Sequence, residues 1–313
     1  MCSRDPWWRA MQGLALLLCL NAPAWARECI GVVPAGASAF WSQLELGTQQ
    51  AARELDIDVL YRGPSREGGV ESQLQLIERF VARGCKALVV APSGEAVGAL
   101  AAELLVQGIP TIYIDRALAN GPLLGLVATD NFAAGLRAGQ HMAEQLQGRG
   151  RVALLRLRPG LQSTGDRERG FRQGAEAGGL QVVLDAYVGD DSQLVQRTLN
   201  PQMAGLDGLF TPNSSGTRAT LAALRRLGKS GQLLHIGFDG DEVLLEALRL
   251  GDIHALLVQQ ARLIGYRAVI LARQMRRTGM PQAPVYTHLE ARLITRANLS
   301  ELYEQLQDLP APP

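Results

Sequence analysis

Short apolar runs alternate with longer amphipathic segments along most of this chain. The early runs are nearly continuous in Val, Ile, Leu and Ala, which is typical of parallel strands covered on both faces. These runs predict strands at 30–34, 57–61, 87–91, 111–114, 124–128, 151–156, 181–186, 208–211, 233–237, 254–258 and 291–295. Between them, apolar residues recur at three- and four-residue spacing and predict helices, among them 41–55, 70–83, 95–107, 132–147 and 215–227.

The repeated strand–helix unit predicts the α/β class, with doubly wound parallel sheets. The strands are too many for one small sheet, and the pattern restarts after Thr129-Asp130-Asn131, so we expect two lobes. An amphipathic helix and an apolar stretch after residue 260 could return to the first lobe, and the last strand could cross back. The expected N-terminal lobe is 28–129 plus 260–288, and the expected C-terminal lobe is 130–259 plus 289–305.

The beginning of the chain has the features of an export signal. Arg4 and Arg9 precede the apolar stretch LALLLCL, and Ala24-Trp25-Ala26 matches the small-x-small pattern of a cleavage site. The apolar stretch is shorter than the ~20 residues that a membrane span requires. We therefore expect a signal peptide at 1–26 and an exported mature chain in an oxidising compartment, with an uncleaved anchor as the alternative.

Composition and charge exclude several classes of function. The chain of 313 residues has a formal net charge of +1 and no Lys/Arg run that would form a DNA-binding arm, so nucleic acid is not an expected partner. The cysteines lack metal-ligand spacing, and the histidines lie near no nucleophile motif. We therefore expect neither an enzyme nor a bound metal or other cofactor.

Cys29 and Cys85 are the cysteines that remain after residues 1–26 are removed. They precede the first and third predicted strands, which are neighbours in a sheet of order 2-1-3-4-5. In an oxidising compartment this placement favours a disulfide, which would close a long loop and contribute about 4 kcal/mol to stability. The alternative is a pair of buried free thiols, because Cys also behaves as a small hydrophobic residue.

Polar side chains recur where buried strands give way to loops. Because the loops at the carboxyl ends of strands converge on the ligand crevice of open α/β sheets, these residues are expected to form one site. A surface ion pair, helix capping, a plain turn and a hinge role are the structural alternatives for individual members. The residues are Asp115, Arg116, Arg167, Asn213, Asp239 and Gln259.

Seven fragments, in this order, resemble the periplasmic sugar-binding proteins of the ribose-binding type, the exported receptors of ABC importers. They are IGVVPAGASAFW, IPTIYIDRAL, VATDNFAAG, STGDRERGF, LFTPNSSGT, HIGFDG and ALLVQQ. The resemblance implies the type I periplasmic binding fold, in which several hinge strands join the lobes and a monosaccharide or polyol binds between them. It also implies a periplasmic monomer with an ABC permease as partner. The alternative partner is a membrane sensor, either a histidine kinase or a chemoreceptor.

The same resemblance assigns roles to individual residues. Phe40 and Trp41 occupy the place of aromatics that stack on the sugar, and the six strand-end residues match polar positions of the family site. Ser38 and Ala91 stand where ribose binders usually carry Asn, and Ala261 stands where Pro is common, which implies a sugar other than ribose. The chemistry suits a sugar, because carboxylates accept from hydroxyls, guanidiniums donate as a fork and amides do both. The expected ligand-binding residues are Phe40, Trp41, Asp115, Arg116, Arg167, Asn213, Asp239 and Gln259.

Overall fold

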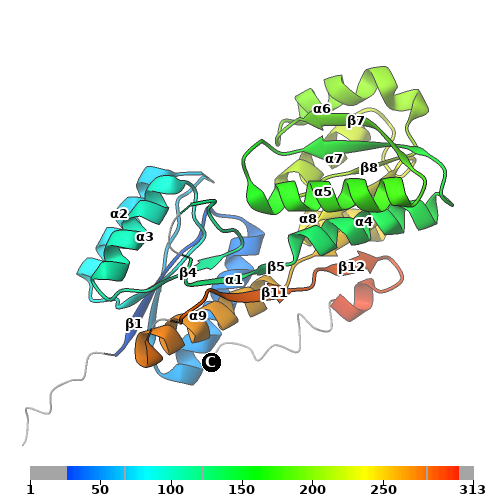
Figure 1. Cartoon of the computed structure of the whole chain (residues 1–313). Helices are drawn as coiled ribbons and strands as arrows, with labels where there is room; N and C mark the ends of the chain where they lie inside the picture. Colours follow the sequence, from blue (N-terminus) through cyan, green and yellow to red (C-terminus); the bar gives the residue numbers. More distant parts are fainter. Residues whose placement is uncertain (1–26, 67, 121–122, 280, 303–313) are drawn as a thin grey trace, which may run out of the picture.

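The computed structural model describes residues 27–66, 68–120, 123–279 and 281–302. It has two lobes, each with a six-stranded sheet covered by helices (Figure 1). This confirms the predicted α/β class with two parallel-sheet lobes. The signal-peptide prediction at 1–26 and the last expected residues of the second lobe, 303–305, lie outside the described residues.

The sheet of the first lobe has the strand order β11-β5-β4-β3-β1-β2, and all its strand pairs are parallel. The order of β2, β1, β3, β4 and β5 is the doubly wound arrangement expected from the sequence. The strands are β1 (Cys29–Val33), β2 (Asp58–Tyr61), β3 (Ala87–Val90), β4 (Thr111–Ile114), β5 (Gly125–Thr129) and β11 (Val285–Leu289). The helices of this lobe are α1 (Ala39–Leu55), α2 (Val70–Ala82), α3 (Glu95–Val106) and α9 (Ala261–Thr278).

The sheet of the second lobe repeats this plan in the order β12-β10-β9-β8-β6-β7, with β12 antiparallel to β10. The strands are β6 (Arg151–Arg156), β7 (Gln181–Tyr187), β8 (Gly208–Phe210), β9 (Leu234–Phe238), β10 (Ala255–Val258) and β12 (Arg292–Thr295). The helical segments are α4 (Asn131–Gln145), α5 (Gln162–Ala177), α6 (Ser192–Leu199), η2 (Asn200–Gly205), α7 (Ser214–Arg226) and α8 (Glu242–Leu250). Where the sequence analysis predicted a strand, the observed ends differ from the predicted ones by at most one residue.

The central strands of the first lobe are apolar throughout because each face of the sheet has its own core. Val32 and Val89 pack toward α1 and α9, whereas the alternate residues Val33, Leu88 and Val90 pack toward α2 and α3. Strand residues alternate between the two faces of a sheet, so a strand covered on both sides has no position for an exposed polar residue. Asp115 and Arg116 therefore follow the carboxyl end of β4, where the cavity described below lies.

The chain passes between the lobes three times: from β5 to α4, from β10 to α9 and from β11 to β12. The helix after each of the first two crossings packs on another helix of the lobe it enters, α4 on α5 and α9 on α1. Glycine permits both contacts. A Cβ atom on Gly135 of α4 would lie 2.0 Å from the Arg167 carbonyl oxygen, and one on Gly47 of α1 would lie 1.8 Å from that of Arg262.

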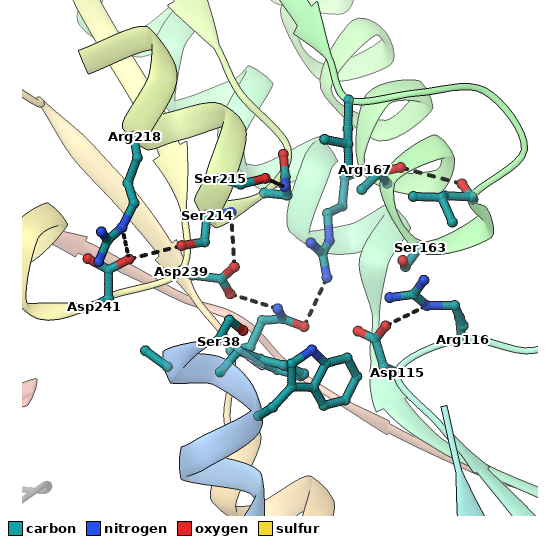
Figure 2. A pocket seen from close by; sticks show the side chains of 18 of the residues that line it. Ser38, Asp115, Arg116, Ser163, Arg167, Ser214, Ser215, Arg218, Asp239 and Asp241 are labelled. Atoms are coloured by element: carbon teal, nitrogen blue, oxygen red, sulfur yellow. Dashed lines mark hydrogen bonds and ion pairs between the residues drawn. The ribbon is translucent and has the colours of Figure 1, made fainter. Parts of the chain in front are cut away.

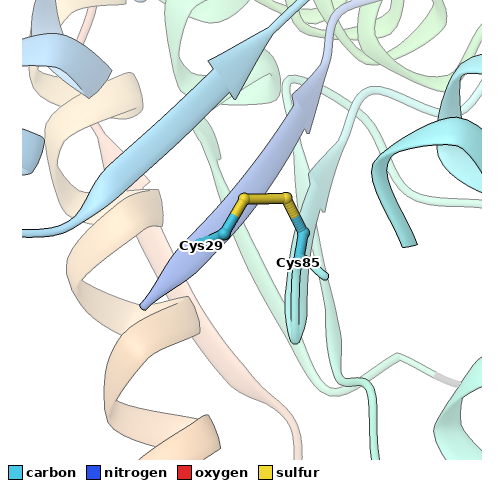
Figure 3. The surroundings of a disulfide bond; sticks show 2 residues. All are labelled: Cys29 and Cys85. Atoms are coloured by element: carbon cyan, nitrogen blue, oxygen red, sulfur yellow. A yellow bond between two sulfur atoms is a disulfide. The ribbon is translucent and has the colours of Figure 1, made fainter. Parts of the chain in front are cut away.

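Cys29 and Cys85 form a disulfide between the amino ends of β1 and β3 (Figure 3). Their Cα atoms are 4.3 Å apart although 56 positions separate them in sequence. The Lys86 N–H also donates to the Cys29 carbonyl oxygen (3.0 Å), which continues the pairing of the two strands. The bridge therefore lies at the edge of the sheet opposite the carboxyl ends of the strands.

Within the described ranges, no helix is long and apolar enough to cross a membrane.

Candidate ligand-binding site

A cavity of about 360 Å³ lies between the lobes, at the carboxyl ends of the strands of both sheets (Figure 2). Its wall includes all eight side chains that the sequence predicts to bind a ligand. The first lobe contributes the start of α1 and the loop after β4, and the second lobe contributes the start of α5 and the loops after β8 and β9. Beside the cavity the lobes touch through a hydrogen bond from Ala117 N–H to Gln162 Oε1 (3.0 Å).

Asp115 and Arg116 follow β4 directly and are buried, with side chains 7% and 8% exposed. Arg116 Nε donates to Asp115 Oδ2 at 2.8 Å. This burial excludes the alternative of a solvated surface ion pair. Asp115 has a φ of 66°, in the left-handed region that a non-glycine residue adopts at an energetic cost, and such residues concentrate at functional sites.

Arg167 lies on α5 and not at the end of a strand, so the prediction of a strand-end position is wrong for this residue. Its guanidinium is fixed from three directions. Nε donates to Asn131 Oδ1 (2.8 Å), one terminal nitrogen to the Pro212 carbonyl (2.9 Å) and the other to Gln259 Oε1 (2.9 Å). The guanidinium carbon also lies 3.8 Å from the centre of the Phe238 ring, a cation–π distance. The side chain is buried in the cavity wall, whereas its neighbour Arg169 is 68% exposed.

Asp239 follows β9 as Asp115 follows β4, and it has the same unusual backbone conformation, with a φ of 70°. Its carboxylate accepts from Gln259 Nε2 (2.7 Å) and from the Ser214 N–H (3.2 Å). Burial raises the pKa of Asp239 and the nearby Asp115 adds to this rise, while Arg167 and the bond from Gln259 oppose it. The carboxylate is therefore less favourably ionised than one in water.

Gln259 connects the site to the crossings between the lobes. Its Oε1 accepts from Thr129 Oγ1 (2.8 Å), at the end of β5, and from Arg167 of the second lobe. Its amide nitrogen donates to Asp239. Gln259 therefore lies in the cavity wall and at the hinge at the same time, so the two alternatives for this residue are not exclusive.

Asn213 occupies the position before α7, yet its side chain makes no capping hydrogen bond. Its Nδ2 instead donates to Ser215 Oγ at 2.8 Å. The capping alternative considered for Asn213 is therefore wrong. Asp241 caps the next helix, α8, because its Oδ1 accepts from the Leu244 N–H at 3.1 Å.

Phe40 and Trp41 both line the cavity from the first turn of α1. Their rings meet edge to face with centroids 4.7 Å apart, a favourable arrangement for two aromatics. Trp41 is 4% exposed and also belongs to the core between the sheet and α1, whereas Phe40 is half-buried. The Tyr61 hydroxyl donates to the Trp41 carbonyl (2.8 Å) and holds this turn against β2.

The cavity wall also contains polar residues that the sequence analysis did not predict. Ser163 and Thr164 precede Arg167 by three or four positions, the spacing that places side chains on one face of a helix. This periodicity could have identified them once Arg167 was chosen. The other unpredicted polar members of the wall are Ser38, Ser214, Ser215, Arg218 and Asp241.

Among the described residues, no group of three His, Cys, Asp or Glu side chains could hold a metal ion.

The fold and the cavity define a two-lobed ligand-binding protein whose site is completed by both lobes. Residues 30–279 match the family model described as the periplasmic binding protein domain, and the chain belongs to this family. The chain is similar to the ribose import binding protein RbsB of Haemophilus influenzae, with 29% identity over 237 residues, 74% of this chain and 80% of the relative. It is also similar to the D-apiose import binding protein of Paraburkholderia graminis, with 25% identity over 74% of this chain and 75% of the relative.

A solved structure extends this similarity. It is the periplasmic component of an ABC-type sugar transport system from Hahella chejuensis, which is 34% identical and has a TM-score of 0.76. The match covers 85% of this chain and 99% of that protein. These relatives are named as binding components of transport systems and not as enzymes.

Proposed function

We propose that the chain is exported to the periplasm after removal of residues 1–26, binds a neutral monosaccharide or polyol between its lobes and presents it, as a monomer, to an ABC permease. The relatives named for ribose and D-apiose import support the ligand class and the partner. The eight proposed ligand-binding residues are Phe40, Trp41, Asp115, Arg116, Arg167, Asn213, Asp239 and Gln259.

The charge balance of the cavity carries this proposal. Among the described residues, the charged side chains of the wall are three aspartates and three arginines. Arg116 pairs with Asp115, and Arg218 pairs with Asp241. The positive charge of Arg167 favours the ionised form of Asp239 and so opposes the rise in its pKa. A sugar acid, a phosphate ester or an amine would add an uncompensated charge to this balanced set, whereas a neutral polyhydroxy ligand adds none.

The same groups suit hydroxyls in number and type. Each ionised carboxylate accepts from more than one hydroxyl, and each guanidinium donates in a planar fork. Trp41 and Phe40 supply an apolar surface that can cover the C–H face of a sugar ring. Enclosure between the lobes strengthens these hydrogen bonds because it removes competing water.

The experiment is a ligand screen on the chain that starts at Arg27. Trp41 is its only tryptophan, since Trp7, Trp8 and Trp25 precede that residue, so a change in intrinsic fluorescence reports on the cavity wall. We expect one or more neutral pentoses, hexoses or polyols to change this fluorescence and to raise the melting temperature. If sugar acids or amino acids do so and no neutral sugar or polyol does, the proposed ligand class is wrong.

Two arginines of α5 provide a matched pair of variants. Arg167→Lys keeps the charge but removes the planar fork in the cavity wall, and we expect affinity to fall by about tenfold or more. Arg169→Lys makes the same change at an exposed position two residues away, and we expect affinity to stay unchanged. Equal affinities of the two variants would contradict the assignment of Arg167 to the site.

A further inference from the structure

The cavity extends beyond the residues assigned above to a second polar region. Figure 2 shows Asp115 and Arg116 at one end of the cavity and Arg218 and Asp241 at the other, with Asp239 between them. We call this second region the outer subsite. It consists of Ser214, Arg218 and Asp241, which hydrogen-bond to one another and line the same cavity.

Ser214 connects the outer subsite to the rest of the cavity. Its N–H donates to Asp239 (3.2 Å) and its hydroxyl donates to Asp241 Oδ2 (2.9 Å), so it lies between the two carboxylates. Arg218 Nε donates to the same Oδ2 at 2.8 Å. A ligand bound against Asp239 therefore has the outer subsite directly beside it.

The outer subsite is suited to a neutral hydroxyl. Burial opposes ionisation of Asp241, but the hydrogen bonds from Arg218, the Leu244 N–H and Ser214 outweigh it and lower its pKa. The ionised Asp241 compensates the charge of Arg218, so the pair presents no net charge to a ligand. The Arg218 side chain is 47% exposed and contacts Asp241 through Nε, and its planar guanidinium has further N–H donors on the two terminal nitrogens.

A purely structural role accounts for only part of this arrangement. Capping of α8 involves Asp241 Oδ1, which accepts from the Leu244 N–H. The other oxygen, together with Arg218 and Ser214, belongs to the polar cluster at the cavity wall.

We propose that the outer subsite binds a neutral hydroxyl-bearing substituent, such as the hydroxymethyl group of a hexopyranose, so that hexoses bind more tightly than the pentoses that share their ring. This inference rests on the proposed function and names the ligand class within it. The ring binds against Asp115, Arg167 and Asp239, and the substituent lies beside Ser214, where it donates to Asp241 and accepts from Arg218.

The test compares sugars that differ only by this group: D-ribose with D-allose, D-xylose with D-glucose, and L-arabinose with D-galactose. Affinities are measured by calorimetry and Trp41 fluorescence on the chain that starts at Arg27. In the pair whose ring stereochemistry fits the cavity, we expect the hexose to bind at least about tenfold more tightly than the pentose. The hexose gains hydrogen bonds to a charged pair of side chains. Equal or tighter binding of the pentose in every pair would overturn the inference and leave the proposed function intact, whereas no binding of any neutral sugar or polyol would overturn both.

Variants separate the outer subsite from the rest of the cavity. Arg218→Gln should bring the ratio of hexose to pentose affinity close to one. Arg167→Lys should weaken both sugars and preserve the ratio. If Arg218→Gln preserves the ratio, the outer subsite does not contact the ligand.

Arg225→Gln provides a control on the same helix. Arg225 is 46% exposed and pairs with Asp252 through the same kind of contact, two turns away from Arg218 and outside the cavity wall. We expect this variant to bind both sugars as the natural chain does. If the ratio of hexose to pentose affinity falls to about one in Arg225→Gln as well, the effect of Arg218→Gln comes from disturbing α7. That result would overturn the assignment of Arg218 to the outer subsite.

Discussion

Replacing Asp239 by asparagine separates the effect of this carboxylate on the stability of the protein from its effect on ligand affinity. Burial is the largest cause of its raised pKa, and it outweighs the attraction of Arg167 and the bond from Gln259. Asparagine has nearly the same shape, has no charge and tolerates the left-handed backbone, where this residue has a φ of 70°. The substitution therefore changes the charge with little change in the turn.

The Asp239→Asn variant without ligand should be more stable than the natural chain at neutral pH. Because the native pKa lies above the unfolded value of about 3.9, the native state binds more protons in the window between the two values, and stability falls as the pH rises through it. The Asp239→Asn variant lacks this loss. Its urea-induced unfolding, compared with the natural chain at acidic and neutral pH, should show the difference at neutral pH alone.

The ligand affinity of the same variant should fall. A hydrogen bond to a charged group contributes about 1.5–3 kcal/mol, so the loss of one such bond from a sugar hydroxyl weakens binding by about 10- to 150-fold. Calorimetry with the best sugar of the screen measures this loss. Asp190→Asn, at an exposed position outside the cavity wall, should leave affinity unchanged and serves as the control. An Asp239→Asn protein that binds normally, or that unfolds more easily without ligand, would refute this reasoning.

The disulfide and the buried His235 lead to two expectations about stability. Replacing Cys29 and Cys85 by serine should lower the free energy of unfolding by about 4 kcal/mol, the chain-entropy value for a loop of this length, and leave sugar affinity unchanged; an unchanged urea midpoint would contradict it. Burial lowers the pKa of His235 from 6.5 to about 3, so stability is complete above pH 6.5 and is lost as the pH falls toward 3. That loss of stability is about 4–5 kcal/mol. In acid unfolding, His235→Gln should lose less stability than the natural chain, whereas the exposed control His288→Gln should lose as much.

The fold could be predicted because its signals are local in the sequence. Strands such as β1, β3 and β4 are buried on both faces, so each is a continuous apolar run that ends where polar residues begin. The disulfide followed from the strand order together with the expected oxidising compartment, since Cys29 and Cys85 lie at the amino ends of neighbouring strands. Contacts between residues that do not lie at the ends of strands leave no comparable pattern in the sequence.

The outer part of the cavity could not be predicted for a different reason. Whether Ser214, Arg218 and Asp241 reach the cavity depends on how α7 and α8 are oriented, and this orientation depends on the packing of the second lobe. The turn after β9 contributes as well, because Asp239 adopts a left-handed conformation two residues before Asp241. A sequence pattern shows that Asp241 can cap a helix but not that its second oxygen meets Arg218.

The hydrogen bonds of Gln259 imply that ligand binding and lobe movement are coupled. This one amide contacts Thr129, which ends β5 of the first lobe, and Asp239 and Arg167, which belong to the second. The two chain crossings that flank the cavity begin at these same points, after β5 and after β10. Any rotation of one lobe relative to the other therefore changes at least one of these contacts, and a ligand that bonds to Asp239 or Arg167 changes the stability of the same network. Such differential contact between two lobe arrangements is what allows a small ligand to shift the equilibrium between them.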